Sequence, residues 1–196
     1  VKVTFDKSAT DRYCEHKRIR QSSFFAHLYM QAFGHMGGWD RVMISSLHSN
    51  RSHAELAGMM SLAMRNFPLV CRHVVPVDDP GFGAAVLAGI HDIERQMNDA
   101  MNISFYDYYG SNGLGRKSPN IAMKTAYVYY IGLSDDLTGL VNLVPLPQSV
   151  RELAMEPLVA YVNRDADENY EVTLKYNHRC YHAATIRRMA NYMSAY

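Results

Sequence analysis

Polar residues that could act as a nucleophile and a base lie in the first part of the stretch Trp39–Val70. They are one aspartate, two serines and one histidine: Asp40, Ser45, Ser46 and His48. Because successive side chains of a strand point to opposite faces, neighbours in this run do not converge on one site. The chain also has no G-x-S-x-G sequence, the strained turn that exposes a nucleophilic serine. The pattern therefore does not indicate a serine hydrolase.

Histidines elsewhere in the chain raise the question of a metal site. His178 and His182 are four residues apart with Cys180 between them, but they straddle the predicted start of a helix at about His182. No second ligand pair accompanies them, and a zinc site usually takes four ligands. His27 and His35 share one predicted helix at a separation of about 12 Å along its axis. We therefore predict no metal site and assign these histidines to the core or the surface.

Hydrophobic periodicity divides the stretch Trp39–Val70 into short elements. The apolar run 40–47 predicts a strand, and 48–51 is a polar turn. A capping pattern predicts a short helix over 52–60. A second strand follows and contains Pro68, and a proline in a strand belongs at an edge or a bulge.

The rest of the chain mixes helices and strands without a regular β–α–β alternation. Helices are expected over 8–20, 22–36, 80–101 and 183–196, and further strands over 1–5, 123–132, 139–147, 156–165 and 169–177. This order predicts an α+β sandwich, in which helices pack on one face of a mixed β-sheet.

Size and composition indicate an ordinary globular domain. The 196 residues are 48% hydrophobic and 20% charged, which fits a single domain over 1–196. A net charge of +1 argues against a nucleic-acid binder driven by electrostatics. The chain lacks an apolar run of the roughly 18 to 20 residues that cross a bilayer. The three cysteines form no C-x-x-C pair, and with the absence of an apolar core in the first residues they favour a cytoplasmic protein.

Four blocks of sequence occur in an order that is similar to one known family. The block SSFFAHLYMQAFGHMGGWDRVMISSLHSNRSHAEL resembles a long helix, a strand and a G-x-P-x-x-x-R turn, with Arg51 at the arginine. MMSLAMRNFPLVCR resembles GxFVNTLPLR, and the helix from Pro80 with NISFYDYY resembles a helix followed by HQDxPFE. YEVTLKYNHRCYHAATIRRMANYM resembles a closing strand, YNxxLFDxxTIxRL and a final helix. Together the blocks resemble the C-terminal half of a nonribosomal peptide synthetase condensation domain, in the chloramphenicol acetyltransferase-like superfamily.

This resemblance implies a fold, a reaction and partners. Condensation domains have two acetyltransferase-like halves with a substrate tunnel between them, so this chain would form one wall of the tunnel. They form an amide bond between acyl or aminoacyl thioesters and amines on carrier proteins. The resemblance thus implies no bound cofactor in this chain, 4'-phosphopantetheine on partner carrier proteins, and the N-terminal half of the domain as a further partner. Association with other copies of the chain is left open, and neither nucleic acid nor a membrane is expected.

The resemblance also singles out residues of the tunnel wall and none with a catalytic role. They are Ser49, Asn50, Arg51, Arg65 and Asn66. Arg51 would hold its turn through backbone carbonyls or an ion pair with the other half, or it is a solvated loop residue. Arg65 stands where the family has an asparagine. Facing inward, its charge would hold an acyl carbonyl or a carboxylate; facing outward, it is a surface charge on an edge strand.

The sequence departs from the family in ways that leave catalysis open. The catalytic motif HHxxxDG, which the family carries in its N-terminal half, does not occur here. We therefore expect the chain to be inactive alone. One alternative is a non-catalytic module that docks carrier proteins or associates with itself. A further alternative is a small trimeric acetyltransferase with an active site between subunits, for which His178 and His182 are the candidate histidines.

Overall fold

The computed structural model describes residues 1–48, 65–102, 125–129 and 157–195. Within these residues the chain forms one sheet of six strands in the order β1-β6-β5-β4-β2-β3. The strands are β1 Lys2–Phe5, β2 Val42–His48, β3 Arg65–Cys71, β4 Thr125–Tyr129, β5 Leu158–Arg164 and β6 Tyr170–Tyr176. The helices are α1 Lys7–Lys17, α2 Gln21–Gly37, α4 Phe82–Asn102 and α7 Ala183–Ala195. The predicted strand over 139–147 and the predicted helix over 52–60 fall outside the described residues.

The sheet is mixed, as predicted. β4 pairs parallel with β2 on one side and with β5 on the other, and the outer pairs β2·β3, β5·β6 and β1·β6 are antiparallel. Among the described strands β3 lies at one edge, and it holds Pro68. An edge is one of the positions predicted for a proline in a strand, because proline cannot donate a ladder hydrogen bond.

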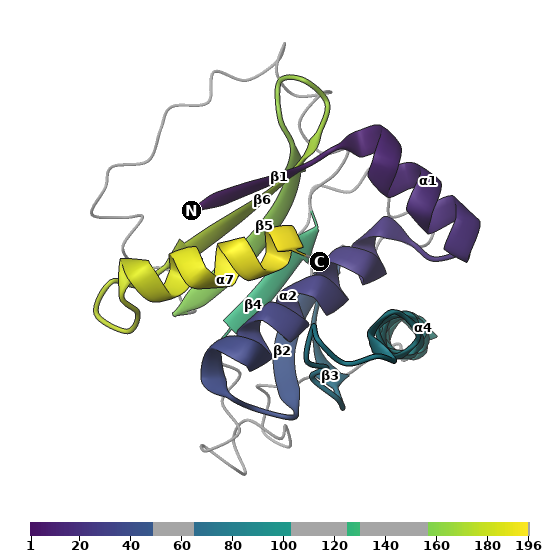
Figure 1. The fold of residues 1–196 in the computed structure, drawn as a ribbon, viewed down its shortest axis with the longest axis horizontal. Coiled ribbons are helices and arrows are strands. Elements are labelled where there is room, and N and C mark those ends of the chain that lie inside the picture. Colours follow the sequence, from purple (N-terminus) through teal and green to yellow (C-terminus); the bar gives the residue numbers. More distant parts are fainter. Residues whose placement is uncertain (49–64, 103–124, 130–156, 196) are drawn as a thin grey trace.

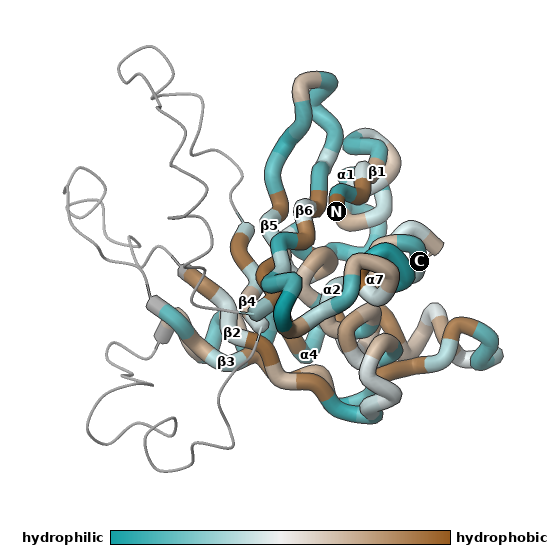
Figure 2. The backbone as a smooth tube through the Cα atoms, turned by 90° about the vertical axis from the view of Figure 1, so that its left-hand side faces the viewer, coloured by the Kyte–Doolittle hydropathy of each residue, from teal (hydrophilic) through white to brown (hydrophobic). Residues whose placement is uncertain are grey.

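All four described helices gather on one side of the sheet (Figures 1 and 2), which confirms the predicted α+β class. α2 packs against the sheet and against both α7 and α4. Most of the core lies beneath these helices, and its largest fully buried side chains include Phe25, Tyr29, Tyr127, Ile44, Leu158 and Leu174. The predicted inward residues of α7 are all buried: Ile186, Met189, Ala190 and Met193. None of the helices in the described residues is both long and apolar enough to span a bilayer.

Polar groups beneath α2 are joined by hydrogen bonds. Tyr29 Oη bonds with Oγ1 of Thr125, and Tyr127 Oη donates to the carbonyl of Ser22 at 2.7 Å. The Gln31 side chain accepts from the backbone N–H of Val75 at 2.9 Å. A buried polar group is costly only when it has no partner, so these bonds let α2 stay polar in places and still be buried.

The start of α2 differs from the expected one. The helix begins at Gln21, one residue before the predicted start at 22, with Arg20 at the cap position and no side-chain hydrogen bond to the cap. Instead, the backbone N–H of Arg20 donates to Oε1 of Glu94 in α4 at 2.6 Å. A glutamate that is distant in sequence thus supplies an acceptor at the start of α2, where a local side chain usually provides it.

Candidate functional site

The predicted tunnel residues lie in sequence directly after β2 and at the start of β3. Three of them lie outside the described residues: Ser49, Asn50 and Arg51. The backbone of Arg65 begins β3 and is paired with His48, while the Arg65 side chain also lies outside the described part. Asn66 is described in full and is paired with Leu47. Among the predicted tunnel residues, Asn66 is the one whose side chain lies in the described part of the chain.

Asn66 lies on the face of the sheet that is opposite the helices. Phe67 and Leu69, its neighbours in β3, belong to the helix-side core, and alternation along a strand puts Asn66 on the other face. Its side-chain Oδ1 is buried and has no hydrogen-bond partner within the described residues. A buried polar atom without a partner calls for an explanation, because leaving it unpaired costs about 1 to 3 kcal/mol.

A small apolar cluster lies on this same face. Its buried members are Ala126, Val128 and Val159, and Leu47 and Tyr161 pack against them. Leu47 is the residue opposite Asn66 in the β2–β3 pair. The arrangement places one amide acceptor beside a buried apolar cluster. This acceptor can orient an N–H donor but cannot by itself take or give a proton.

A cluster of polar side chains joins α1, α2 and β6 and has a structural role. Asp11 of α1 accepts hydrogen bonds from Tyr170 Oη at 2.7 Å, Lys7 Nζ at 2.7 Å and Gln21 Nε2 at 3.1 Å. Burial raises the pKa of Asp11, but these three hydrogen bonds outweigh it and hold the pKa below the usual value. Burial and the hydrogen bond to Asp11 raise the pKa of Tyr170 well above its usual value. The carboxylate stays charged and the phenol neutral near pH 7, which suits a fixed link between α1, α2 and β6.

The buried thiols and imidazole do not resemble catalytic groups. Burial raises the pKa of Cys14 to about 11 and raises that of Cys71, so both thiols are protonated near neutral pH. Burial lowers the pKa of His27 to about 4, so this ring is neutral. Within the described residues no three His, Cys, Asp or Glu side chains lie close enough to hold a metal ion. His178 and His182, the histidines of the trimeric alternative, are both exposed.

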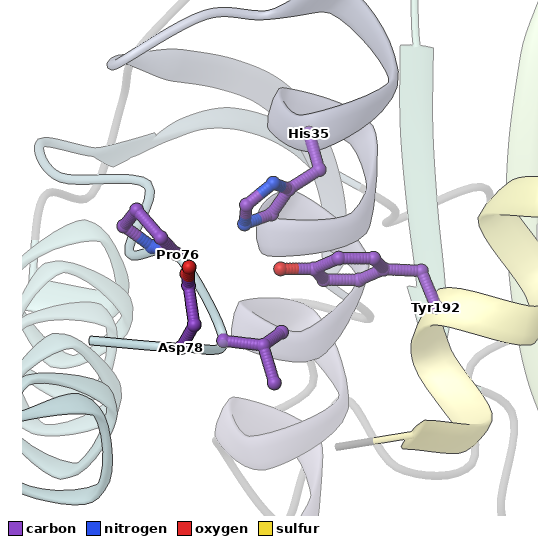
Figure 3. A pocket seen from close by; sticks show the side chains of 5 residues that line it. His35, Pro76, Asp78 and Tyr192 are labelled. Atoms are coloured by element: carbon purple, nitrogen blue, oxygen red, sulfur yellow. The ribbon is translucent and has the colours of Figure 1, made fainter. Parts of the chain in front are cut away.

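A groove on the helix side was not predicted from the sequence. An open cavity of about 590 Å³ is lined by His35, Pro76, Val77, Asp78 and Tyr192 (Figure 3). An adjoining cavity of about 320 Å³ shares two of these residues and is lined by Ala32, His35, Met36, Arg188, Met189 and Tyr192. The His35 and Tyr192 rings lie 4.2 Å apart between centroids, and the Nε2–H of His35 donates to the carbonyl of Val75 at 2.9 Å. We call the two cavities together the α2–α7 groove.

Comparison with known proteins gives a result at the level of the fold. No sequence-family description and no curated protein matches this chain. Among solved structures, the chain is similar to one that concerns condensation domain-mediated chain release from the enacyloxin polyketide synthase, with TM-score 0.68 and 11% identity. The match covers 98% of this chain and 38% of that one.

Two further structures match in the same way. The condensation domain of the monacolin K polyketide synthase has TM-score 0.66 and 18% identity over 99% of this chain and 45% of its own. The epimerization domain from the third module of tyrocidine synthetase B has TM-score 0.64 and 12% identity over 100% of this chain and 45% of its own. The chain therefore has the fold of condensation domains and spans less than half the length of these structures, which confirms the predicted fold resemblance.

Proposed function

We propose that this chain is the C-terminal half of a condensation-type acyltransferase domain. In the assembled domain it forms one wall of a tunnel where an amide bond forms between acyl or aminoacyl thioesters and an amine. The substrates arrive on the 4'-phosphopantetheine arms of carrier proteins. The N-terminal half, with its HHxxxDG motif, supplies the catalytic histidine.

The observation that carries this proposal is the asymmetry of the structural match. Nearly all of this chain superimposes on condensation domains, while 38% to 45% of each of the three compared structures is covered. More than half of each compared structure has no counterpart in residues 1–196. The absence of HHxxxDG from the sequence agrees with this division of labour.

Asn66 gives the proposed wall a chemical task. Joining two tethered substrates depends mainly on holding them in a reactive geometry, with a base to assist the amine. The buried Oδ1 of Asn66, which has no partner among the described residues, is suited to accept a hydrogen bond from a substrate N–H or from the other half. Asn66 would thus be a positioning residue, and no proton would pass through it.

The test is reconstitution from two separate halves. This chain is mixed with an N-terminal half that carries HHxxxDG, and amide formation is measured from carrier-loaded substrates by mass spectrometry. We expect turnover with both halves and none with either alone. A histidine-to-alanine change in the HHxxxDG motif is the control that should abolish turnover without preventing association. Failure of the two halves to associate would contradict the proposal.

Two variants sharpen the same experiment. Asn66→Thr keeps a side-chain acceptor and should retain turnover, whereas Asn66→Leu should reduce it about tenfold through the loss of one hydrogen bond to substrate. For Arg65, binding of an acyl-phosphopantetheine mimic to wild type and to Arg65→Ala decides whether its charge faces the tunnel. Unchanged affinity would leave Arg65 a surface residue. Stable association of the halves without turnover would favour the alternative of a non-catalytic docking module.

A further inference from the structure

The C-terminal part of the chain has an unusual charge pattern. After Glu171 there is no Asp or Glu up to Tyr196, although the whole chain holds 19 acidic residues. The same segment contains Lys175, Arg179 and two adjacent arginines in α7. Positive charge is therefore concentrated on one part of a protein whose net charge is only +1.

The two arginines of α7, Arg187 and Arg188, differ from several cations of α1 and α4. Both are exposed, and no ion pair is formed by either within the described residues. By contrast, Lys7 of α1 pairs with Asp11 at 2.7 Å, and Arg95 of α4 pairs with Asp92. α7 is fixed on the core by its buried residues, so its arginines stand on a rigid support.

Arg188 borders the α2–α7 groove, which places an apolar surface beside the positive charge. Met36, Met189 and Tyr192 line the groove next to Arg188. The adjoining part extends the apolar lining to Pro76 and Val77, and Val77 is 44% exposed (Figure 3). A groove with apolar lining and an exposed arginine at its edge suits a protein segment that brings an apolar anchor and an acidic residue.

We propose that the α2–α7 groove binds an acidic amphipathic helix of a partner protein. An apolar side chain of the helix inserts beside Met36 and Tyr192, and a carboxylate on the same face of the helix pairs with Arg188. A helix can do both because residues three and four positions apart lie on one face.

The charges of the groove favour a protein over a nucleic acid. Asp78 lines the larger cavity and Arg188 the smaller one, so a single carboxylate can pair with Arg188, whereas a phosphate backbone that crosses both cavities would be repelled by Asp78. Nucleic-acid binding also needs many cations along a backbone path, and the cation that lines the groove is Arg188, in a chain of net charge +1. The proposal goes beyond the tunnel function, because the groove lies on the helix side of the sheet and Asn66 lies on the other side.

The experiment measures binding of a synthetic fluorescent helical peptide made of Ala and Glu with one central Leu. Fluorescence anisotropy should show binding that weakens as salt is raised. Arg188→Glu should weaken it about tenfold, since the change replaces an attraction with a repulsion. Arg12→Glu is the matched control, because Arg12 is also an exposed helical arginine and lies on α1. It should change the affinity less than twofold.

Peptide variants separate the apolar contribution to binding from the contribution of charge. Replacing Leu by Ser should abolish binding through loss of the apolar anchor, and replacing Glu by Lys should abolish it through charge. Absence of binding by the Glu/Leu peptide would overturn the proposal. Equal losses in Arg188→Glu and Arg12→Glu would also overturn it, as would equally strong binding of a single-stranded oligonucleotide. None of these measurements needs the N-terminal half, so their failure is distinct from failure of reconstitution.

Discussion

The two faces of the sheet differ in whether their buried polar groups have hydrogen-bond partners among the described residues. On the helix side, large aromatic and aliphatic side chains are buried, and buried hydroxyls such as those of Tyr29 and Tyr127 have hydrogen-bond partners. The opposite face carries a small cluster around Val128 and Val159, beside a buried Asn66 oxygen with no partner in the described residues. The comparison indicates that the main core that stabilises the fold lies on the helix side, whereas the other face has a buried polar atom without a partner among the described residues.

The largest expected effect is a truncation in the helix-side core. Phe25 is fully buried. The centroid of its ring lies 5.1 Å from that of Tyr170 and 5.4 Å from that of Phe5. Phe25→Ala should lower the free energy of unfolding by about 4 kcal/mol, through lost burial and the cavity left behind. Urea denaturation followed by circular dichroism measures this, and a loss below about 1 kcal/mol would contradict the assignment of the main core.

The next largest expected effect is a pH dependence of the free energy of unfolding, which arises from a buried histidine on the helix side. His27 is 1% exposed, and burial lowers its pKa from 6.5 to about 4. The unfolded chain therefore takes up a proton below about pH 6.5 while the folded protein does not. The free energy of unfolding should fall by up to about 3 kcal/mol from this residue as the pH drops from 6.5 to 4.

The measurement compares urea denaturation at pH 7 and pH 4.5 for wild type and His27→Gln. Because carboxylates titrate in both proteins, the difference between their pH responses isolates His27. The variant should lose less stability than wild type over this interval. An identical pH response would show that His27 is accessible to protons in the folded state.

A matched pair of valines compares the two faces directly. Val162 and Val159 lie in the same strand, β5, and face opposite sides, with exposed fractions of 0% and 6%. Val162→Ala should cost about 2 kcal/mol, because it leaves a cavity in the large core. Val159→Ala should cost about half as much, since its cluster is smaller. Thermal and urea unfolding of both variants test the order, and a larger loss for Val159→Ala would reverse the comparison.

The smallest expected effect on stability is at Asn66. Asn66→Leu removes a buried acceptor that has no partner among the described residues, so the free energy of unfolding should stay equal or rise by up to about 1 kcal/mol. The same change should lower turnover in the reconstituted domain. A stability loss above about 2 kcal/mol would show that Asn66 is satisfied in the folded chain and supports the fold.

Most helices and strands were predictable because their patterns are local. The inward stripe of α7, the alternation of β6 and the edge position of Pro68 each follow from residue spacing or from proline chemistry. The capping of α2 was not predictable, because Glu94 and Arg20 are 74 residues apart in sequence. The α2–α7 groove was missed for the same reason, although the lack of acidic residues after Glu171 was a visible signal.

The sequence by itself determined the fold class, the positions of most elements and the absence of the HHxxxDG motif. It also pointed to Asn66, through a resemblance and without a stated role. Only the tertiary structure decided that the Asn66 oxygen is buried without a partner in the described residues, and that Arg188 borders an apolar groove. The physical reason is that element type depends on neighbours in sequence, whereas burial and pairing depend on which distant segments pack together.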